Sequence, residues 1–153
     1  MIYLVIRNLF LKGLDNEKRI FVCHGNICRS PIAEYVFKYK TKGMDCYCES
    51  RALSNEEIGN DIYPGSKKVL DKHHIPYDRH YAKRMTLDDY NDYDEIYIMD
   101  SSNEKLINRM FDDVDHKISK LAPFDIEDPW YTGNFDKVFD EISEAIDCII
   151  KTW

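Results

Sequence analysis

The chain lacks an apolar run long enough to cross a bilayer as a helix, a span that needs about 20 residues. The most apolar stretch, residues 1–14, is interrupted by Arg7 and Lys12. It also lacks the basic start and the small-residue cleavage site of a secretory signal. We therefore expect no stable membrane insertion. Residues 1–17 are interpreted as an N-terminal extension of unknown role.

Basic residues are too few to give the chain a positive charge. There are 21 lysines and arginines against 28 aspartates and glutamates, for a net charge of −7. A protein that coats nucleic acid needs the opposite balance, so we expect no nucleic-acid partner. Any site for an anion must be a local exception to this acidic field.

The sequence also lacks the cysteine pairs that frame a structural zinc site. Its five cysteines form an odd number, and no tandem C-x-x-C pairs occur among them. A chain of 153 residues can bury a core without a metal or a disulfide. The sequence therefore predicts no metal, no cofactor, and a location in the reducing cytoplasm.

Strands and helices alternate along the remaining chain, with no repeats, low-complexity tract or linker. The apolar pattern predicts strands at residues 18–22, 45–51, 95–99 and 117–121. It also predicts a helix with Pro31 in its first turn, a helix that opens at Pro64, a helix over Leu106, Ile107 and Met110 with cap residues at Asp100, Ser101 and Ser102, and a helix from about 135 to 150. This alternation is typical of an α/β protein. We predict one domain, residues 18–153, built as a flavodoxin-like three-layer sandwich with a central four-stranded parallel sheet and helices on both faces.

The turn after the first strand is the most informative stretch, because ligands of parallel sheets bind beyond the carboxyl ends of the strands. It reads Cys-His-Gly-Asn-Ile-Cys-Arg-Ser over residues 23–30. Such a loop directs backbone N–H groups and a helix N-terminus at a tetrahedral oxyanion. Gly25 and Asn26 are expected to accept the positive φ angles that the loop needs. Arg29 can hold two oxygens of the anion, and Cys23 should be a thiolate.

A second segment, residues 126–133, carries a candidate proton donor. Asp128 could protonate the oxygen that leaves a phosphate ester, while Trp130 and Tyr131 could flank an aryl group. Structural interpretations compete with these functions: a buried cysteine is commonly a packing residue, Asp-Pro commonly begins a turn, and aromatic pairs commonly lie in cores.

The two segments together resemble one protein family. VCHGNICRSPIAE, residues 22–34, with EDPWYTG, residues 127–133, is similar to the bacterial form of the low-molecular-weight protein tyrosine phosphatases. Further similar segments are residues 50–54, 57–60, 80–83 and 99–103. The resemblance implies hydrolysis of phosphotyrosine in proteins, and of small aryl phosphates, through a phosphocysteine intermediate.

The resemblance also implies roles for individual residues. Cys23 matches the nucleophile, Arg29 the phosphate-binding arginine, and Asp128 the general acid. The substrate-binding residues would be His24, Gly25, Asn26, Ile27, Cys28, Ser30, Trp130 and Tyr131. Ser50 and His80 would support the loop through Asn26, and Cys28 would be able to form a reversible disulfide with Cys23.

Several alternatives share the fold. Phosphoarginine phosphatases of the family carry a threonine at the position of Ile27, and thioredoxin-coupled arsenate reductases need two further cysteines after the third strand. A phosphocarrier of similar fold would lack the loop arginine and the acid, and a pure phosphotyrosine-binding module would lack the nucleophile or Asp128. We expect a phosphotyrosine protein as substrate, with a bacterial tyrosine kinase as a candidate partner, and a monomer or weak homodimer. Glu56, at a rim position that is aromatic in animal members, predicts weaker binding of acidic phosphopeptides.

Overall fold

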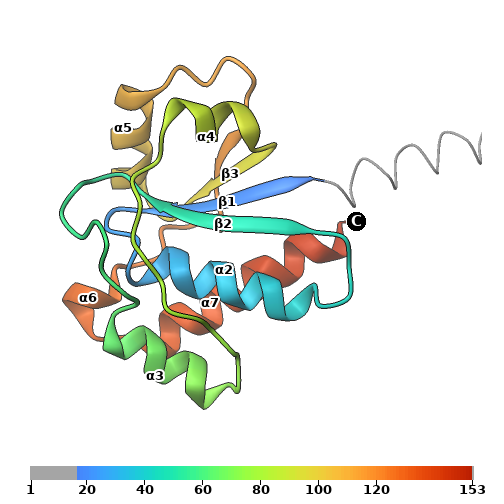
Figure 1. Ribbon diagram of the computed structural model, residues 1–153, viewed down its shortest axis with the longest axis vertical. Coiled ribbons are helices and arrows are strands. Elements are labelled where there is room, and N and C mark those ends of the chain that lie inside the picture. Colours follow the sequence, from blue (N-terminus) through green and yellow to red (C-terminus); the bar gives the residue numbers. More distant parts are fainter. Residues whose placement is uncertain (1–16, 153) are drawn as a thin grey trace, which may run out of the picture.

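The computed structural model describes residues 17–152, so the interpretation of residues 1–16 lies outside the described part of the chain. Its centre is a parallel sheet of four strands in the order β2-β1-β3-β4 (Figure 1). The strands are β1 (Lys18–Cys23), β2 (Tyr47–Ala52), β3 (Glu95–Ile98) and β4 (Ile118–Lys120). The predicted α/β architecture and the parallel sheet are confirmed.

Side chains of β1 alternate between two hydrophobic cores, because successive residues of a strand point to opposite faces of the sheet. Phe21 and Cys23 pack into the core that α2, α3 and α7 cover. Ile20 and Val22 pack into the other core, which α4 and α5 cover. The sheet therefore lies between two helical layers, as Figure 1 shows. Residues 20–23 of β1 are all apolar because both faces of the strand are buried there.

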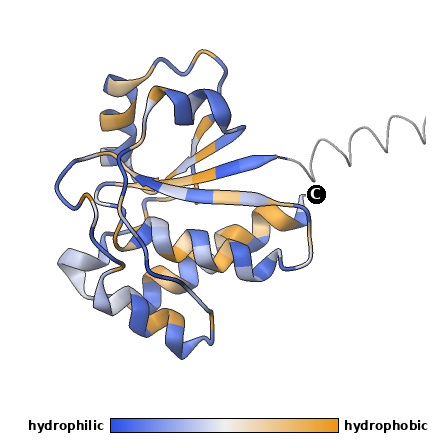
Figure 2. Cartoon of the chain, in the orientation of Figure 1, coloured by the Kyte–Doolittle hydropathy of each residue, from blue (hydrophilic) through white to orange (hydrophobic). Residues whose placement is uncertain are grey.

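Three helices form one layer and two form the other. The first layer contains α2 (Arg29–Lys40), α3 (Pro64–Lys72) and α7 (Phe135–Lys151), and the second contains α4 (Leu87–Asp92) and α5 (Ser101–Met110). On α7, the predicted apolar stripe is buried over Val138, Phe139, Ile142, Ala145 and Ile146. Hydrophobic residues accordingly recur along this helix and along the strands in Figure 2. Burying each large apolar side chain contributes about 1.5–3 kcal/mol.

Two short helices were not predicted. α4 begins at a capping box, in which the Thr86 hydroxyl accepts a hydrogen bond from the backbone N–H of Asp89 and the Asp89 carboxylate accepts one from that of Thr86. α6 (Pro129–Thr132) is a single turn. Both are shorter than the periodic patterns that identify a helix from sequence.

The second strand begins later and ends later than predicted. β2 starts at Tyr47 and continues to Ala52, because the backbone of Ala52 bonds to a later segment of the chain. The N–H of Ala52 donates to the carbonyl oxygen of Lys83 at 2.7 Å, and its carbonyl oxygen accepts from the N–H of Met85 at 2.8 Å.

Within residues 17–152, none of the helices has the length and apolar character required to span a membrane.

Candidate active site

The loop of residues 23–30, here called the cradle loop, connects β1 to α2 at the carboxyl end of the sheet. In the strand order β2-β1-β3-β4, the chain passes from β1 to one neighbour and later returns to the other. The loop thus follows the strand at which the sheet changes direction, where open α/β sheets bind ligands. No side chain caps the first turn of α2, and no acidic residue lies in that turn.

The backbone of the cradle loop differs from the prediction at one glycine. Asn26 has a φ of 60°, as expected, but Gly25 does not have a positive φ. The space around Gly25 gives a different reason for a small residue there. A Cβ atom at Gly25 would lie 3.3 Å from Cγ of Glu57, so a side chain would press on the neighbouring loop.

Asn26 is the hub of the hydrogen bonds that hold the loop. Its Nδ2 donates to Oγ of Ser30 at 2.8 Å and to Oγ of Ser50 at 2.9 Å. Its Oδ1 accepts from the backbone N–H of Lys83 at 3.1 Å, and its carbonyl lies 2.7 Å from Nε2 of His80. Both predicted support residues, Ser50 and His80, therefore contact Asn26.

Cys23 lies at the base of this network and is only 2% exposed. Its Sγ lies 3.1 Å from Oγ of Ser30, and the backbone N–H of Asn26 points at it from 3.3 Å. Because Ser30 already accepts a hydrogen bond from Asn26, its own hydroxyl proton is available to the sulfur. Two hydrogen-bond donors therefore converge on the Cys23 sulfur.

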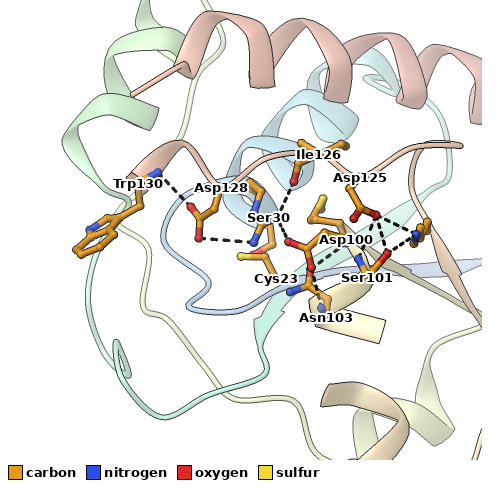
Figure 3. A network of polar contacts seen from close by, with 12 residues as sticks. Cys23, Ser30, Asp100, Ser101, Asn103, Asp125, Ile126, Asp128 and Trp130 are labelled. Carbon is orange, nitrogen blue, oxygen red and sulfur yellow. Dashed lines mark hydrogen bonds and ion pairs between the residues drawn. The ribbon is translucent and has the colours of Figure 1, made fainter. Parts of the chain in front are cut away.

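Arg29 is buried and held by three groups. Its Nη1 donates to Oδ2 of Asp100 and to the carbonyl oxygen of Ile126, each at 2.7 Å, and its Nη2 lies 3.6 Å from Oδ2 of Asp128 (Figure 3). Burial opposes the charge, but the neighbouring Cys23, Asp100 and Asp128 raise the pKa of Arg29 above its usual range. The guanidinium is therefore a fixed positive charge.

Asp128 is the N-cap of α6. Its Oδ1 accepts a hydrogen bond from the backbone N–H of Trp130 at 3.1 Å, while Oδ2 faces Arg29. Figure 3 shows the Asp128 carboxylate between Trp130 and the side of the pocket that holds Cys23. The short helix ends at Gly133, which has a φ of 76°.

The predicted residues converge on one pocket with a volume of about 130 Å³. Its lining consists of Cys23, His24, Gly25, Ile27, Cys28, Arg29, Glu56, Glu57, Asp128, Trp130 and Tyr131. Trp130 and Tyr131 are 51% and 78% exposed, so they lie at the mouth and not in the core. Asn26 and Ser30 are fully buried behind the lining.

The second cysteine of the cradle loop, Cys28, is also buried. Burial, followed by the nearby charges of Cys23 and Asp128, raises the pKa of Cys28 to about 12. Cys28 is therefore a neutral thiol at physiological pH.

Among residues 17–152, no group of three or more histidine, cysteine or acidic side chains is arranged to hold a metal ion.

Three residues of the site were not identified as such from the sequence. Asp100 was interpreted as a helix cap. It does cap α5, where its Oδ1 accepts from the backbone N–H of Asn103 at 2.7 Å, but its other oxygen holds Arg29. Glu34 accepts from Oγ of Ser50 at 2.6 Å, and Glu57 lines the pocket. All three lie within the segments that carry the family resemblance, which was the available signal.

Comparison with known proteins identifies similar chains over most of this length. Residues 18–152 match the family model described as low molecular weight phosphotyrosine protein phosphatase. A low molecular weight protein-tyrosine-phosphatase PtpA from Staphylococcus epidermidis is 36% identical over 139 residues, which is 85% of this chain and 89% of the relative. The corresponding Staphylococcus aureus proteins are 34% identical over the same shares.

Solved structures resemble the fold as well. The low molecular weight protein tyrosine phosphatase SP-PTP from Streptococcus pyogenes is similar with a TM-score of 0.85 and 37% identity, covering 89% of this chain and 92% of that one. YfkJ from Bacillus subtilis is similar with a TM-score of 0.82 and 29% identity, covering 89% and 93%.

Proposed function

Because the chain belongs to the low molecular weight phosphotyrosine protein phosphatase family and is a protein-tyrosine phosphatase, we propose that Cys23 is its nucleophile, Arg29 its phosphate-binding residue and Asp128 its general acid. The observation that carries this proposal is the convergence of these three side chains on one pocket, although Asp128 is remote from the other two in sequence. Residues 18–153 would then form the phosphatase domain and residues 1–17 an extension of unknown role.

In the first step, the Cys23 thiolate attacks the phosphorus of phosphotyrosine and forms an S–P bond. Asn26 and Ser30 stabilise the thiolate through the contacts at 3.3 and 3.1 Å. Arg29 and the backbone N–H groups of the cradle loop hold the three remaining oxygens as charge shifts across the phosphoryl group. The other substrate-binding residues are the predicted ones of the cradle loop, together with Trp130 and Tyr131 beside the ring.

The departing tyrosyl oxygen needs a proton as its bond to phosphorus breaks, and Asp128 supplies it. In the second step, Asp128 accepts a proton from water, which attacks the phosphocysteine. The S–P bond then breaks, phosphate is released, and Cys23 returns to the thiolate, assisted by the Ser30 hydroxyl.

The alternatives of the same fold are disfavoured by particular residues. Ile27 lines the pocket and packs against the cluster that contains Cys28 and Ala82, so it fills space that a threonine would leave. This favours phosphotyrosine over phosphoarginine. Residues 54–144 contain no cysteine, which disfavours the thioredoxin-coupled arsenate reductase. Arg29 and Asp128 both line the pocket, which disfavours a phosphocarrier, and the presence of Cys23 with Asp128 disfavours a binding module.

Cellular context follows from this chemistry. A catalytic thiolate needs a reducing compartment, so we assign the protein to the cytoplasm. We further propose that it acts as a monomer or weak homodimer. Its phosphotyrosine substrates would include a bacterial tyrosine kinase. Pull-down of phosphorylated kinase by the Cys23→Ser variant tests that partner, and sedimentation tests the assembly. Fractionation that recovers the protein outside the cytoplasm would contradict the location.

Cys23 is also proposed to be redox-sensitive. Peroxide would oxidise the thiolate to a sulfenic acid, and attack by Cys28 would then form a disulfide and release water. The raised pKa of Cys28 makes this closure slow. Mass spectrometry after peroxide treatment should find a Cys23–Cys28 disulfide in the native protein and a sulfinic acid at Cys23 in Cys28→Ser. Equal sulfinic acid in both proteins would contradict the proposal.

The experiment that tests the function compares hydrolysis of phosphotyrosine, phosphoarginine and phosphoserine in EDTA. We expect the reduced protein to hydrolyse phosphotyrosine and Cys23→Ser to be inactive. The Cys46→Ser variant is the matched control, because Cys46 lies outside the pocket. Turnover that survives in Cys23→Ser would contradict the assignment of the nucleophile.

A further inference from the structure

Part of the pocket lining is acidic. Glu56 and Glu57 both line it, and the Glu56 side chain is 69% exposed. Glu57 is fixed close to the cradle loop, since its Oε2 accepts a hydrogen bond from Nδ2 of Asn60 at 2.6 Å and its Cγ lies near Gly25. We call Glu56 and Glu57 the acidic rim.

Little positive charge offsets this rim. Among the lining residues, all of which the structure describes, only Arg29 and His24 can be cationic. Arg29 is 2% exposed and contacts Asp100, Ile126 and Asp128, so its charge is not available to residues that lie over the exposed rim. His24 is half-exposed and its Nε2 lies 3.2 Å from Oε2 of Glu56, so it can neutralise at most one of the two carboxylates.

A peptide that places phosphotyrosine in the cradle must lay its neighbouring residues over this mouth. The phosphate meets a cationic floor, but the residues beside it meet carboxylates. From this geometry, we infer that Glu56 and Glu57 select phosphotyrosine flanked by lysine or arginine and reject phosphotyrosine flanked by acidic residues. The inference rests on the proposed function, because it requires phosphotyrosine to bind beside Cys23.

Each pair of opposite charges at an exposed rim contributes little binding free energy, and salt screens the attraction. One favourable contact changes kcat/KM by about 1.5- to 5-fold, and two contacts combine. We therefore expect peptides flanked by lysines to exceed otherwise identical peptides flanked by glutamates by about 5- to 20-fold at low salt. Glutamine-flanked peptides should fall between them, and the ratio should shrink towards one at about 0.5 M NaCl.

The test measures kcat/KM for these three peptides with the native enzyme, with Glu56→Gln/Glu57→Gln, and with Glu144→Gln. Glu144 is an exposed residue of α7 outside the pocket, so its variant changes the net charge without altering the rim. The ratio between peptides is read within each enzyme, which removes any general loss of activity. We expect the lysine-to-glutamate ratio to fall at least 3-fold in the rim variant and to stay unchanged in Glu144→Gln.

Equal kcat/KM for the three peptides with the native enzyme would overturn the inference, as would a preference that the rim variant retains in full. A preference that Glu144→Gln loses equally would also overturn it, because net charge would then be the cause. Failure on every peptide and on p-nitrophenyl phosphate has a different meaning, since it would overturn the proposed catalytic site itself.

Discussion

The cradle loop and the segment of residues 127–133, here called the acid segment, meet at Arg29 but are held in the molecule in different ways. Six of the eight residues of the cradle loop are buried, and Asn26 alone bonds to five other residues. In the acid segment only Pro129 is buried, and residues 130–133 are exposed. One region is rigid because the fold packs around it, whereas the other contacts the rest of the molecule mainly through residues 127–129.

This difference separates two kinds of energetic consequence. Removing a buried polar side chain leaves partners unsatisfied and costs stability as well as function. Removing an exposed one affects little besides the reaction it takes part in. Variants of the two regions should therefore differ in how activity loss relates to stability loss.

Asp128→Asn should give the largest loss of activity with little loss of stability. Asparagine caps a helix as well as aspartate does, so α6 keeps its cap, but it cannot donate the proton. We expect kcat for phosphotyrosine to fall by about 10²–10⁴-fold. The loss should be smaller for p-nitrophenyl phosphate, whose leaving group needs no proton. Kinetics on both substrates, with thermal unfolding of the same samples, check this. An equal loss on both substrates would argue against a proton donor.

Asn26→Ala should break the cradle loop and lower stability and activity together. Alanine loses the three side-chain hydrogen bonds and must adopt the positive φ of 60°. We expect a loss of about 2–4 kcal/mol in the free energy of unfolding. Asn26→Gly is the matched variant, since it loses the same bonds without the backbone strain and should be about 1 kcal/mol more stable. Urea unfolding distinguishes them, and equal stabilities would show that φ carries no strain.

Asp100→Asn tests whether Arg29 belongs with the rigid region. The amide keeps the cap of α5 but replaces the charged partner of the guanidinium at 2.7 Å with a neutral one. We expect about 1–2 kcal/mol of lost stability and roughly a 10-fold lower kcat/KM. Asp125→Asn is a suitable control, since Asp125 bonds to Ser101 and Lys120 outside the pocket. If activity fell without any loss of stability, Asp100 would behave like the residues of the acid segment and unlike those of the cradle loop.

Trp130→Ala should give the smallest effect of these variants. It tests whether an exposed residue of the acid segment affects activity without affecting stability. The indole contacts Tyr131 edge-to-face at 4.8 Å between ring centroids and is half-exposed. We expect KM for phosphotyrosine to rise about 2- to 10-fold and the unfolding midpoint to stay nearly constant. Steady-state kinetics and calorimetry measure both. A marked loss of stability would show that the aromatic pair is structural.

The fold could be predicted from sequence where burial is two-sided. β1 and α7 are apolar enough for the type of element to be clear, and their bounds agree with prediction within a residue or two. α4 could not be found in this way, because only Tyr90 of its six residues is buried. Its capping box is the sequence signal that was overlooked.

The site was predictable where chemistry is local and less so where it spans the chain. Residues 23–30 form one continuous loop, so the spacing of Cys23 and Arg29 already described a cradle. Gly25 was misinterpreted because a glycine can serve either a backbone angle or a close approach, and only the neighbouring Glu57 distinguishes them. The contact of Asp100 with Arg29 joins positions 71 residues apart, which no local pattern reveals.

The bond from Arg29 to the carbonyl oxygen of Ile126 has a consequence for how the protein is made. It joins residues 97 positions apart, and the acid follows two residues later. As the chain leaves the ribosome, the cradle loop emerges first, and Arg29 gains this partner only after residues 30–126 have been synthesised. A nascent chain is therefore expected to carry Cys23, the proposed nucleophile, before its pocket is assembled.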